Sequence, residues 1–176
     1  MGYNEGKPYA PARGAAGGQT GIQGEKKGQT MDIMEKTEAL FEKEAWLIDI
    51  FPKTVPYRED GRYFKAERLL QKDRAEIQRR FTRIILKLYC YHDLSVTGSG
   101  LSFALPEPEM LASLLKRFFG AGAASGDLIL YLPEQDAMIV PDREDLHMTV
   151  YAPDEALKEL LAALAGAEGL FFYKAP

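Results

Sequence analysis

The sequence predicts an α+β domain in which helices lie mainly on one face of an antiparallel or mixed sheet. Two observations carry this prediction. Residues 101–132 and residues 147–174 each combine an apolar strand, an amphipathic helix and a second apolar strand. Residues 31–91, which precede them, are dominated by helical patterns. With 46% hydrophobic and 27% charged residues among 176, the chain has the composition of a globular protein that can bury a core.

Residues 1–30 are predicted to be a disordered tail, and residues 31–176 a single domain. The tail holds half of the sixteen glycines and little apolar surface to offset its backbone entropy. Back-translated, Lys27-Gly28 can spell a bacterial ribosome-binding site two codons before Met31. Met31 is therefore a candidate true start, with residues 1–30 as an upstream leader. A genuine flexible tail is the alternative.

The next elements follow from the spacing of apolar residues. Residues 31–45 are expected to form a helix, and residues 46–51 a strand that Pro52 ends. Residues 54–64 form a loop with a turn at Asp60-Gly61. Residues 65–91 are helical, with a break near Gln71–Asp73 and a core-facing stripe made of Ile77, Phe81, Ile84, Ile85 and Leu88. Residues 92–100 are expected to be a loop.

The two C-terminal units match each other in phase. Pro106 and Pro153 suit a first helical turn, and Gly120 and Gly166 suit a helix C-terminus. An extra strand, residues 137–140, lies between the units. We expect their helices to bury Leu114, Phe118, Leu160 and Leu164. Two successive units of this kind resemble the split βαβ, ferredoxin-like arrangement, which many unrelated functions share.

The residue inventory excludes several classes of function. One cysteine, Cys90, and two histidines are too few for a structural zinc site, so no metal and no cofactor are expected. The lone thiol fits a cytoplasmic location, and we expect Cys90 to be buried as a small apolar residue. No apolar run is long enough to span a membrane.

Nucleic acid is not expected as a partner because the net charge is −4. The long helix nevertheless has a cationic face, and Glu76 is placed at helical spacing to pair with two of its arginines. We therefore expect a solvated helix face rather than a phosphate-binding surface. The cationic residues are Arg79, Arg80, Arg83 and Lys87.

The strongest candidate for a binding site is the predicted loop that contains Tyr57, Arg58, Arg62 and Tyr63. Arginine and tyrosine are over-represented in binding hot spots, and loops on a rigid scaffold commonly carry recognition. The partner would be a protein or a small anionic ligand, held by the two arginines. Alternatively, the aromatic residues of this loop only cover the core.

We therefore expect a small binding or interaction module, because no complete catalytic motif is present in the sequence. The alternative is a small enzyme of the hydrolase or transferase class. Its site would be assembled in space from His147, His92 and Asp49. Asp49 lies within an apolar strand, where a buried carboxylate would need a partner.

Overall fold

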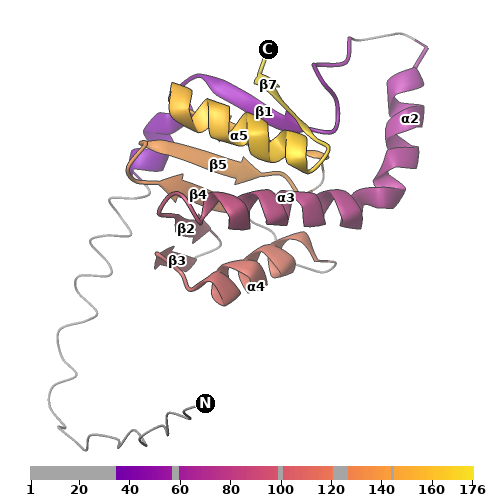
Figure 1. Cartoon of the computed structure of the whole chain (residues 1–176). Helices are drawn as coiled ribbons and strands as arrows, with labels where there is room; N and C mark the ends of the chain where they lie inside the picture. The colour runs from indigo at the N-terminus through magenta and orange to yellow at the C-terminus, as the bar shows by residue number, and fades with distance from the viewer. Residues whose placement is uncertain (1–34, 57–59, 99–100, 121–126, 144) are drawn as a thin grey trace, which may run out of the picture.

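The computed structural model describes residues 35–56, 60–98, 101–120, 127–143 and 145–176. Within these residues, seven strands form one sheet in the order β3-β2-β4-β5-β6-β1-β7, and each described pair is antiparallel (Figure 1). The α+β class and the antiparallel sheet are thus confirmed. The strands are β1 (Ala45–Asp49), β2 (Ser95–Gly98), β3 (Leu101–Ala104), β4 (Ile129–Leu132), β5 (Ala137–Pro141), β6 (His147–Tyr151) and β7 (Phe171–Lys174).

The strand order places one antiparallel strand inside each β-α-β unit. β3 and β4 both pair with β2, so they run parallel to each other on either side of it. In the same way β6 and β7 lie on either side of β1. The first strand of the chain is therefore inserted between the last two.

Three helices cover one face of this sheet: α3 (Arg74–Leu88), α4 (Pro108–Phe119) and α5 (Glu155–Ala167) (Figure 1). Pro108 occupies the first turn of α4, where its missing N–H costs no hydrogen bond. The prediction for Pro106 and Pro153 was wrong, since both precede the N-cap of their helix. α5 begins at a capped end, because the Asp154 carboxylate accepts the Leu157 N–H at 2.7 Å. Helices mainly on one face were the expectation from the sequence.

The main core lies between these helices and the sheet. The stripe predicted for α3 is buried as expected, since Ile77, Phe81, Ile84, Ile85 and Leu88 all belong to the core cluster. The stripe on the two later helices is shifted from the prediction. Leu114, Phe118, Leu160 and Leu164 are only half-buried at the edge of the core. The residues that point into it are Leu111, Leu115, Leu157 and Leu161.

A second, smaller apolar cluster lies on the opposite face of the sheet. Leu40 is buried there against Tyr131 and Met138. Leu40 is the last residue of the short helical stretch of residues 35–40, within which Thr37 is also buried. Phe41 packs edge-on against Tyr151, with ring centroids 5.2 Å apart. The alternating strand residues thus supply two apolar surfaces, and the chain before β1 covers part of the second one.

The predicted break in the long helical segment is confirmed. A 3₁₀ turn, η1 (Gln71–Asp73), separates α2 (Arg62–Leu70) from α3. At this turn the chain changes direction, so that α2 projects beyond the end of the sheet while α3 lies across it (Figure 1). The position of α2 is central to the candidate site.

Three other local predictions were wrong. Residues 95–98 were expected in a loop and form β2, which pairs on both sides. Gly166 lies inside α5, and the left-handed residue after the helix is Gly169, with φ of 70°. Cys90 is exposed, with its thiol donating to the Leu86 carbonyl oxygen at 3.4 Å.

The predicted tail over residues 1–30 lies outside the described residues. Among the helices that the structure describes, none is both long and apolar enough to cross a bilayer.

Candidate functional site

The segment predicted as a recognition loop is largely the beginning of α2. Gly61 adopts the left-handed conformation, with φ of 63°, and α2 begins at the next residue. The Asp60 carboxylate accepts the Arg62 backbone N–H at 2.9 Å and pairs with the Arg62 guanidinium at 3.1 Å. Arg62 and Tyr63 therefore lie on the first turn of a helix, not on a loop. Tyr57 and Arg58 lie outside the described residues.

The two sides of α2 differ in their contacts. Tyr63, Glu67 and Leu70 are half-buried, and their spacing puts them on the side that faces the body of the protein. The other side is exposed, including two large apolar residues, Phe64 and Leu69, which are each 61% exposed. None of the nine described residues of α2 is buried. The helix is thus attached at one side and unpartnered on the other.

A pocket lies where Tyr63 of α2 meets the ends of β1 and β6. Its volume is about 110 Å³. The described residues that line it include three carboxylates and no lysine or arginine: they are Asp49, Phe51, Tyr63, Glu67, Asp145, Leu146 and His147. Burial raises the pKa of Tyr63, and the charges of Glu67, Asp49 and Asp145 raise this pKa further. The pocket is therefore an acidic environment with an aromatic wall.

Asp49 is the most firmly held carboxylate of this pocket. It lies on the sheet face opposite the three covering helices, because its neighbour Ile48 is the residue that enters the core. Its Oδ2 accepts the Tyr173 hydroxyl at 2.6 Å, and its Oδ1 accepts the Phe51 N–H at 3.0 Å. Burial and then this hydrogen bond raise the pKa of Tyr173. The partner that the sequence could not identify is a tyrosine.

The structure brings together two of the three residues of the predicted catalytic alternative. Asp49 lies directly across from His147 in the pairing of β1 with β6, so their side chains share one face of the sheet. His92 does not line this pocket. It lies shortly before β2, which begins at Ser95. The strand register aligns Ser95 with Tyr131, Met138 and Tyr151 in turn. Tyr151 is at the opposite end of β6 from His147. A three-residue site of Asp49, His147 and His92 is therefore not assembled.

The turn between β5 and β6 adds two carboxylates beside His147. One ligand atom from each of Asp142, Asp145 and His147 lies within 4.8 Å of the others. The Asp142 N–H donates to the His147 carbonyl oxygen at 3.3 Å, and the Asp142 Oδ1 accepts the Asp145 N–H at 2.8 Å. The sequence shows these residues as an acidic run before a histidine. From the sequence, this run could supply a general base or a metal ligand, and a solvated acidic turn is the alternative. How closely the donor atoms converge depends on how the turn folds.

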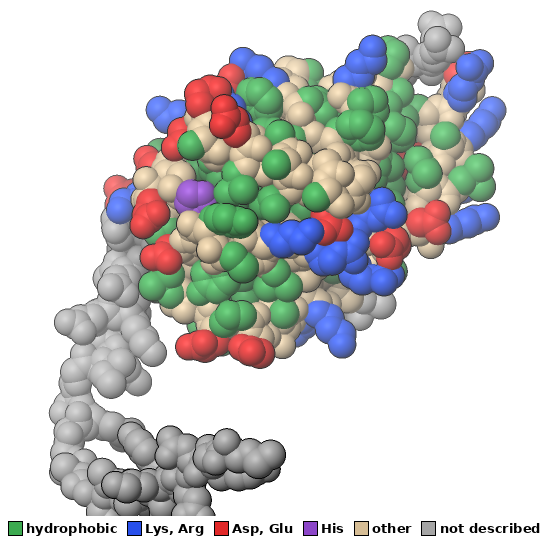
Figure 2. Space-filling view, viewed as in Figure 1, with side chains coloured by type: hydrophobic (Ala, Val, Ile, Leu, Met, Phe, Trp, Pro, Cys, Tyr) green, Lys and Arg blue, Asp and Glu red, His purple; other side chains and the backbone are tan. Residues whose placement is uncertain are grey.

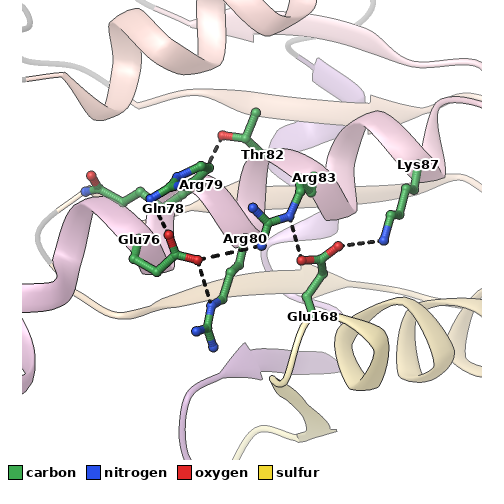
Figure 3. Close-up of polar contacts among 8 residues, drawn as sticks. All are labelled: Glu76, Gln78, Arg79, Arg80, Thr82, Arg83, Lys87 and Glu168. Carbon is green, nitrogen blue, oxygen red and sulfur yellow. Dashed lines mark hydrogen bonds and ion pairs between the residues drawn. The ribbon is translucent and has the colours of Figure 1, made fainter.

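The cationic face of α3 forms a mixed-charge network (Figure 3). Glu76 pairs with Arg79 and Arg80, as the helical spacing predicts, and more distantly with Arg83. Glu168, after α5, accepts hydrogen bonds from Arg83 at 2.6 Å and Lys87 at 2.5 Å. Figure 2 shows carboxylates among the Lys and Arg side chains over this part of the surface. The network serves to hold helices together, which does not favour phosphate binding.

Comparison with models of known protein families, with curated proteins and with solved structures found no match. The function must therefore be inferred from the geometry of the chain itself. Two features carry functional information: the unpartnered side of α2, and the acidic pocket with the Asp142–Asp145–His147 group beside it.

Proposed function

We propose that this protein is a protein-interaction module that docks its partner through the outer side of α2. The observation that carries the proposal is that α2 buries none of its nine described residues, yet exposes Phe64 and Leu69. Exposed apolar residues grouped on one element are typical of protein–protein contact sites. In Figure 2, apolar and cationic side chains lie side by side on the part of the surface that α2 occupies in Figure 1.

The beginning of α2 is held in place, so the helix is presented rather than loose. A helix of nine residues is marginal in isolation. Here the Asp60 carboxylate accepts the N–H of Arg62, the first residue of the helix, and the Tyr63 ring packs against Phe51 with centroids 6.1 Å apart. Because the helix is ordered before binding, less conformational entropy is lost when a partner docks.

The charges on α2 indicate the chemistry of the partner. Arg62, Lys65 and Arg68 are exposed on the same helix as the two apolar residues. Helical geometry places Lys65 and Arg68 between Phe64 and Leu69 on the outer side. The helix therefore fits a groove that offers carboxylates at its centre and apolar contacts at its edges. Arg62 is 72% exposed and is paired with Asp60, so a carboxylate of the partner could replace Asp60 without a large cost.

The test compares α2 variants with a matched exposed residue elsewhere. We expect Phe64→Ser with Leu69→Ser to leave the melting temperature nearly unchanged and to abolish recovery of a defined partner in quantitative affinity purification. Met110→Ser, at an exposed position on α4, is the control and should retain the partner. Arg62→Ala with Lys65→Ala should weaken binding and reduce its dependence on salt. Recovery of the same partner by the double-serine variant at the wild-type level would refute the proposal.

A second candidate function is a small enzyme of the hydrolase or transferase class, with Asp49 and His147 in the acidic pocket. The observation that favours it is their direct pairing across β1 and β6 beside the Tyr173 hydroxyl. A carboxylate next to an imidazole is a common acid–base pair. Under this proposal His147→Ala abolishes turnover of ester or phosphoester substrates, whereas His92→Ala leaves it unchanged.

We propose as well that the β3-α4-β4 and β6-α5-β7 units are a pair of split units of the ferredoxin-like kind, preceded by a mainly helical N-terminal half. Their support is the strand inserted in each unit, β2 in the first and β1 in the second.

A bacterial cytoplasmic location is proposed on the sequence, since a single thiol suits a reducing compartment.

A further inference from the structure

We propose that Asp142, Asp145 and His147 bind a divalent transition-metal ion, of which zinc is the best-fitting example, at the turn between β5 and β6. One donor atom from each residue lies within 4.8 Å of the other two. Two donors on one tetrahedral zinc ion are about 3.4 Å apart, given bond lengths of about 2.0–2.1 Å. The widest separation therefore has to close by at most about 1.4 Å.

The donor set selects the class of ion. One imidazole nitrogen with two carboxylate oxygens suits zinc, manganese, iron, cobalt or nickel. Magnesium and calcium prefer oxygen ligands alone, and usually more of them. Three protein ligands leave a coordination position for water or a ligand group, as in catalytic rather than structural zinc sites. The sequence contains too few cysteines and histidines for a structural zinc site. The Asp142–Asp145–His147 group instead has the three protein ligands of a catalytic zinc site.

The surroundings of His147 supply an independent reason to place a metal there. Metal-bound histidines usually donate their second ring nitrogen to a carboxylate, which orients the ring. Asp49 lies directly across from His147 on the same face of the sheet and already accepts hydrogen bonds from Tyr173 and Phe51. These two bonds fix the position of the Asp49 carboxylate. Asp49 would therefore be a positioning residue for the metal site.

The cation that lies nearest to the proposed ligands in the chain packs against α4. Arg143 lies between the proposed ligands in the chain, but its guanidinium is stacked over the Phe118 ring of α4, 4.8 Å from the ring centre. Its carbonyl oxygen accepts the Gln78 side-chain N–H at 3.3 Å on the helical side. Asp145 and His147 also line the acidic pocket, together with Glu67. The open coordination position of a bound ion would thus be reached from this pocket.

The experiment is a calorimetric titration of tag-free protein with zinc, and separately with magnesium. We expect stoichiometric zinc binding and little magnesium binding. His147→Gln and Asp145→Asn should each weaken zinc binding at least tenfold, and Asp49→Asn should weaken it roughly tenfold to a hundredfold through the ring orientation. His92→Gln and Glu134→Gln are controls away from the group and should bind like the wild type.

Two further readouts make the result decisive. In the wild-type protein, zinc should shift the ring nitrogen resonances of His147 and leave those of His92 unchanged, so the proposal is tested even if a variant is unstable. Cobalt should give a visible spectrum without a thiolate band, which separates this site from binding by the exposed Cys90. Equal affinity in His147→Gln and His92→Gln, or loss of binding in Cys90→Ser, would overturn the proposal. Neither result would affect docking through Phe64 and Leu69.

Discussion

The Glu168 carboxylate accepts a 2.6 Å hydrogen bond from the Arg83 guanidinium and so joins the end of α5 to the middle of α3. The Glu168 side chain is only 7% exposed, and its other oxygen accepts Lys87 at 2.5 Å. This carboxylate is therefore nearly enclosed and bound by two cations from a helix that lies far away in the sequence.

The first prediction concerns the stability that this carboxylate contributes. Glu168→Gln keeps the shape and removes the charge, so we expect it to lower the free energy of unfolding by about 1–2 kcal/mol, as for hydrogen bonds to partly exposed charged groups. The matched control is Glu155→Gln, since Glu155 is 87% exposed in its pair with Lys158. That change should cost less than about 0.5 kcal/mol. Denaturant titrations of both variants measure the difference, and equal losses would contradict it.

The second prediction is the pH dependence of the same interaction. Burial alone would raise the pKa of Glu168, but hydrogen bonds from Lys87 and Arg83 outweigh it and lower the pKa below its ordinary value of 4.5. A lowered pKa in the folded state means that the stabilisation is complete above the ordinary value and is lost as pH falls through the lowered pKa. The stability difference between wild type and Glu168→Gln should therefore shrink on acidification. A difference that is constant across this range would show that charge is not the cause.

The third prediction distinguishes two neighbouring leucines of α5. Leu161 is fully buried in the main core, whereas Leu160 is half-buried at its edge. Leu161→Ala should cost about 2–5 kcal/mol through the transfer and cavity terms, and Leu160→Ala less than half as much. Chemical denaturation of the two variants decides it. If the Leu160 variant were the less stable one, the orientation of α5 on the sheet would be incorrect.

The fourth prediction uses two glycines with opposite surroundings. Gly98 has a φ of 147°, and a Cβ there would lie 2.0 Å from the Asp127 carbonyl oxygen. Gly98→Ala should therefore destabilise the protein by at least about 2 kcal/mol. Gly166 lies within α5, and a Cβ added there would meet no described atom within 4 Å. Gly166→Ala should stabilise by about 0.5–1 kcal/mol because alanine favours the helix. Thermal melts of the pair report both signs.

The sequence predicted correctly those helices whose apolar residues recur at the spacing of a helical turn. The α3 stripe and the break at Gln71–Asp73 follow from periodicity and composition, which depend on neighbours in the chain. β2 was missed because its four residues, Ser95–Gly98, have no strong alternation. They are strand because β3 and β4 pair with them on both sides, and this tertiary pairing overrides the weak local preference.

The candidate site depends more heavily on such distant pairing. Asp49 and His147 were singled out as separate residues, but their alignment is set by the register of two strands that lie far apart in the sequence. Tyr173 was not considered at all, since a tyrosine in an apolar strand carries no local signal. Arg62 and Tyr63 were correctly placed next to the Asp60-Gly61 turn, although they are the first two residues of the helix and not the end of a loop before it.

The insertion of β1 between β6 and β7 has a consequence for synthesis. A ribosome releases β1 long before either neighbour emerges, so the backbone N–H and C=O groups on both sides of β1 lack their native partners until β6 and β7 have been made. Its apolar residues Trp46 and Ile48 are exposed over the same period. Contacts between distant parts of a chain form slowly, and unpaired strand edges invite association with other chains. The order of the strands in the chain therefore leaves both edges of β1 open to other chains until β6 and β7 have been made.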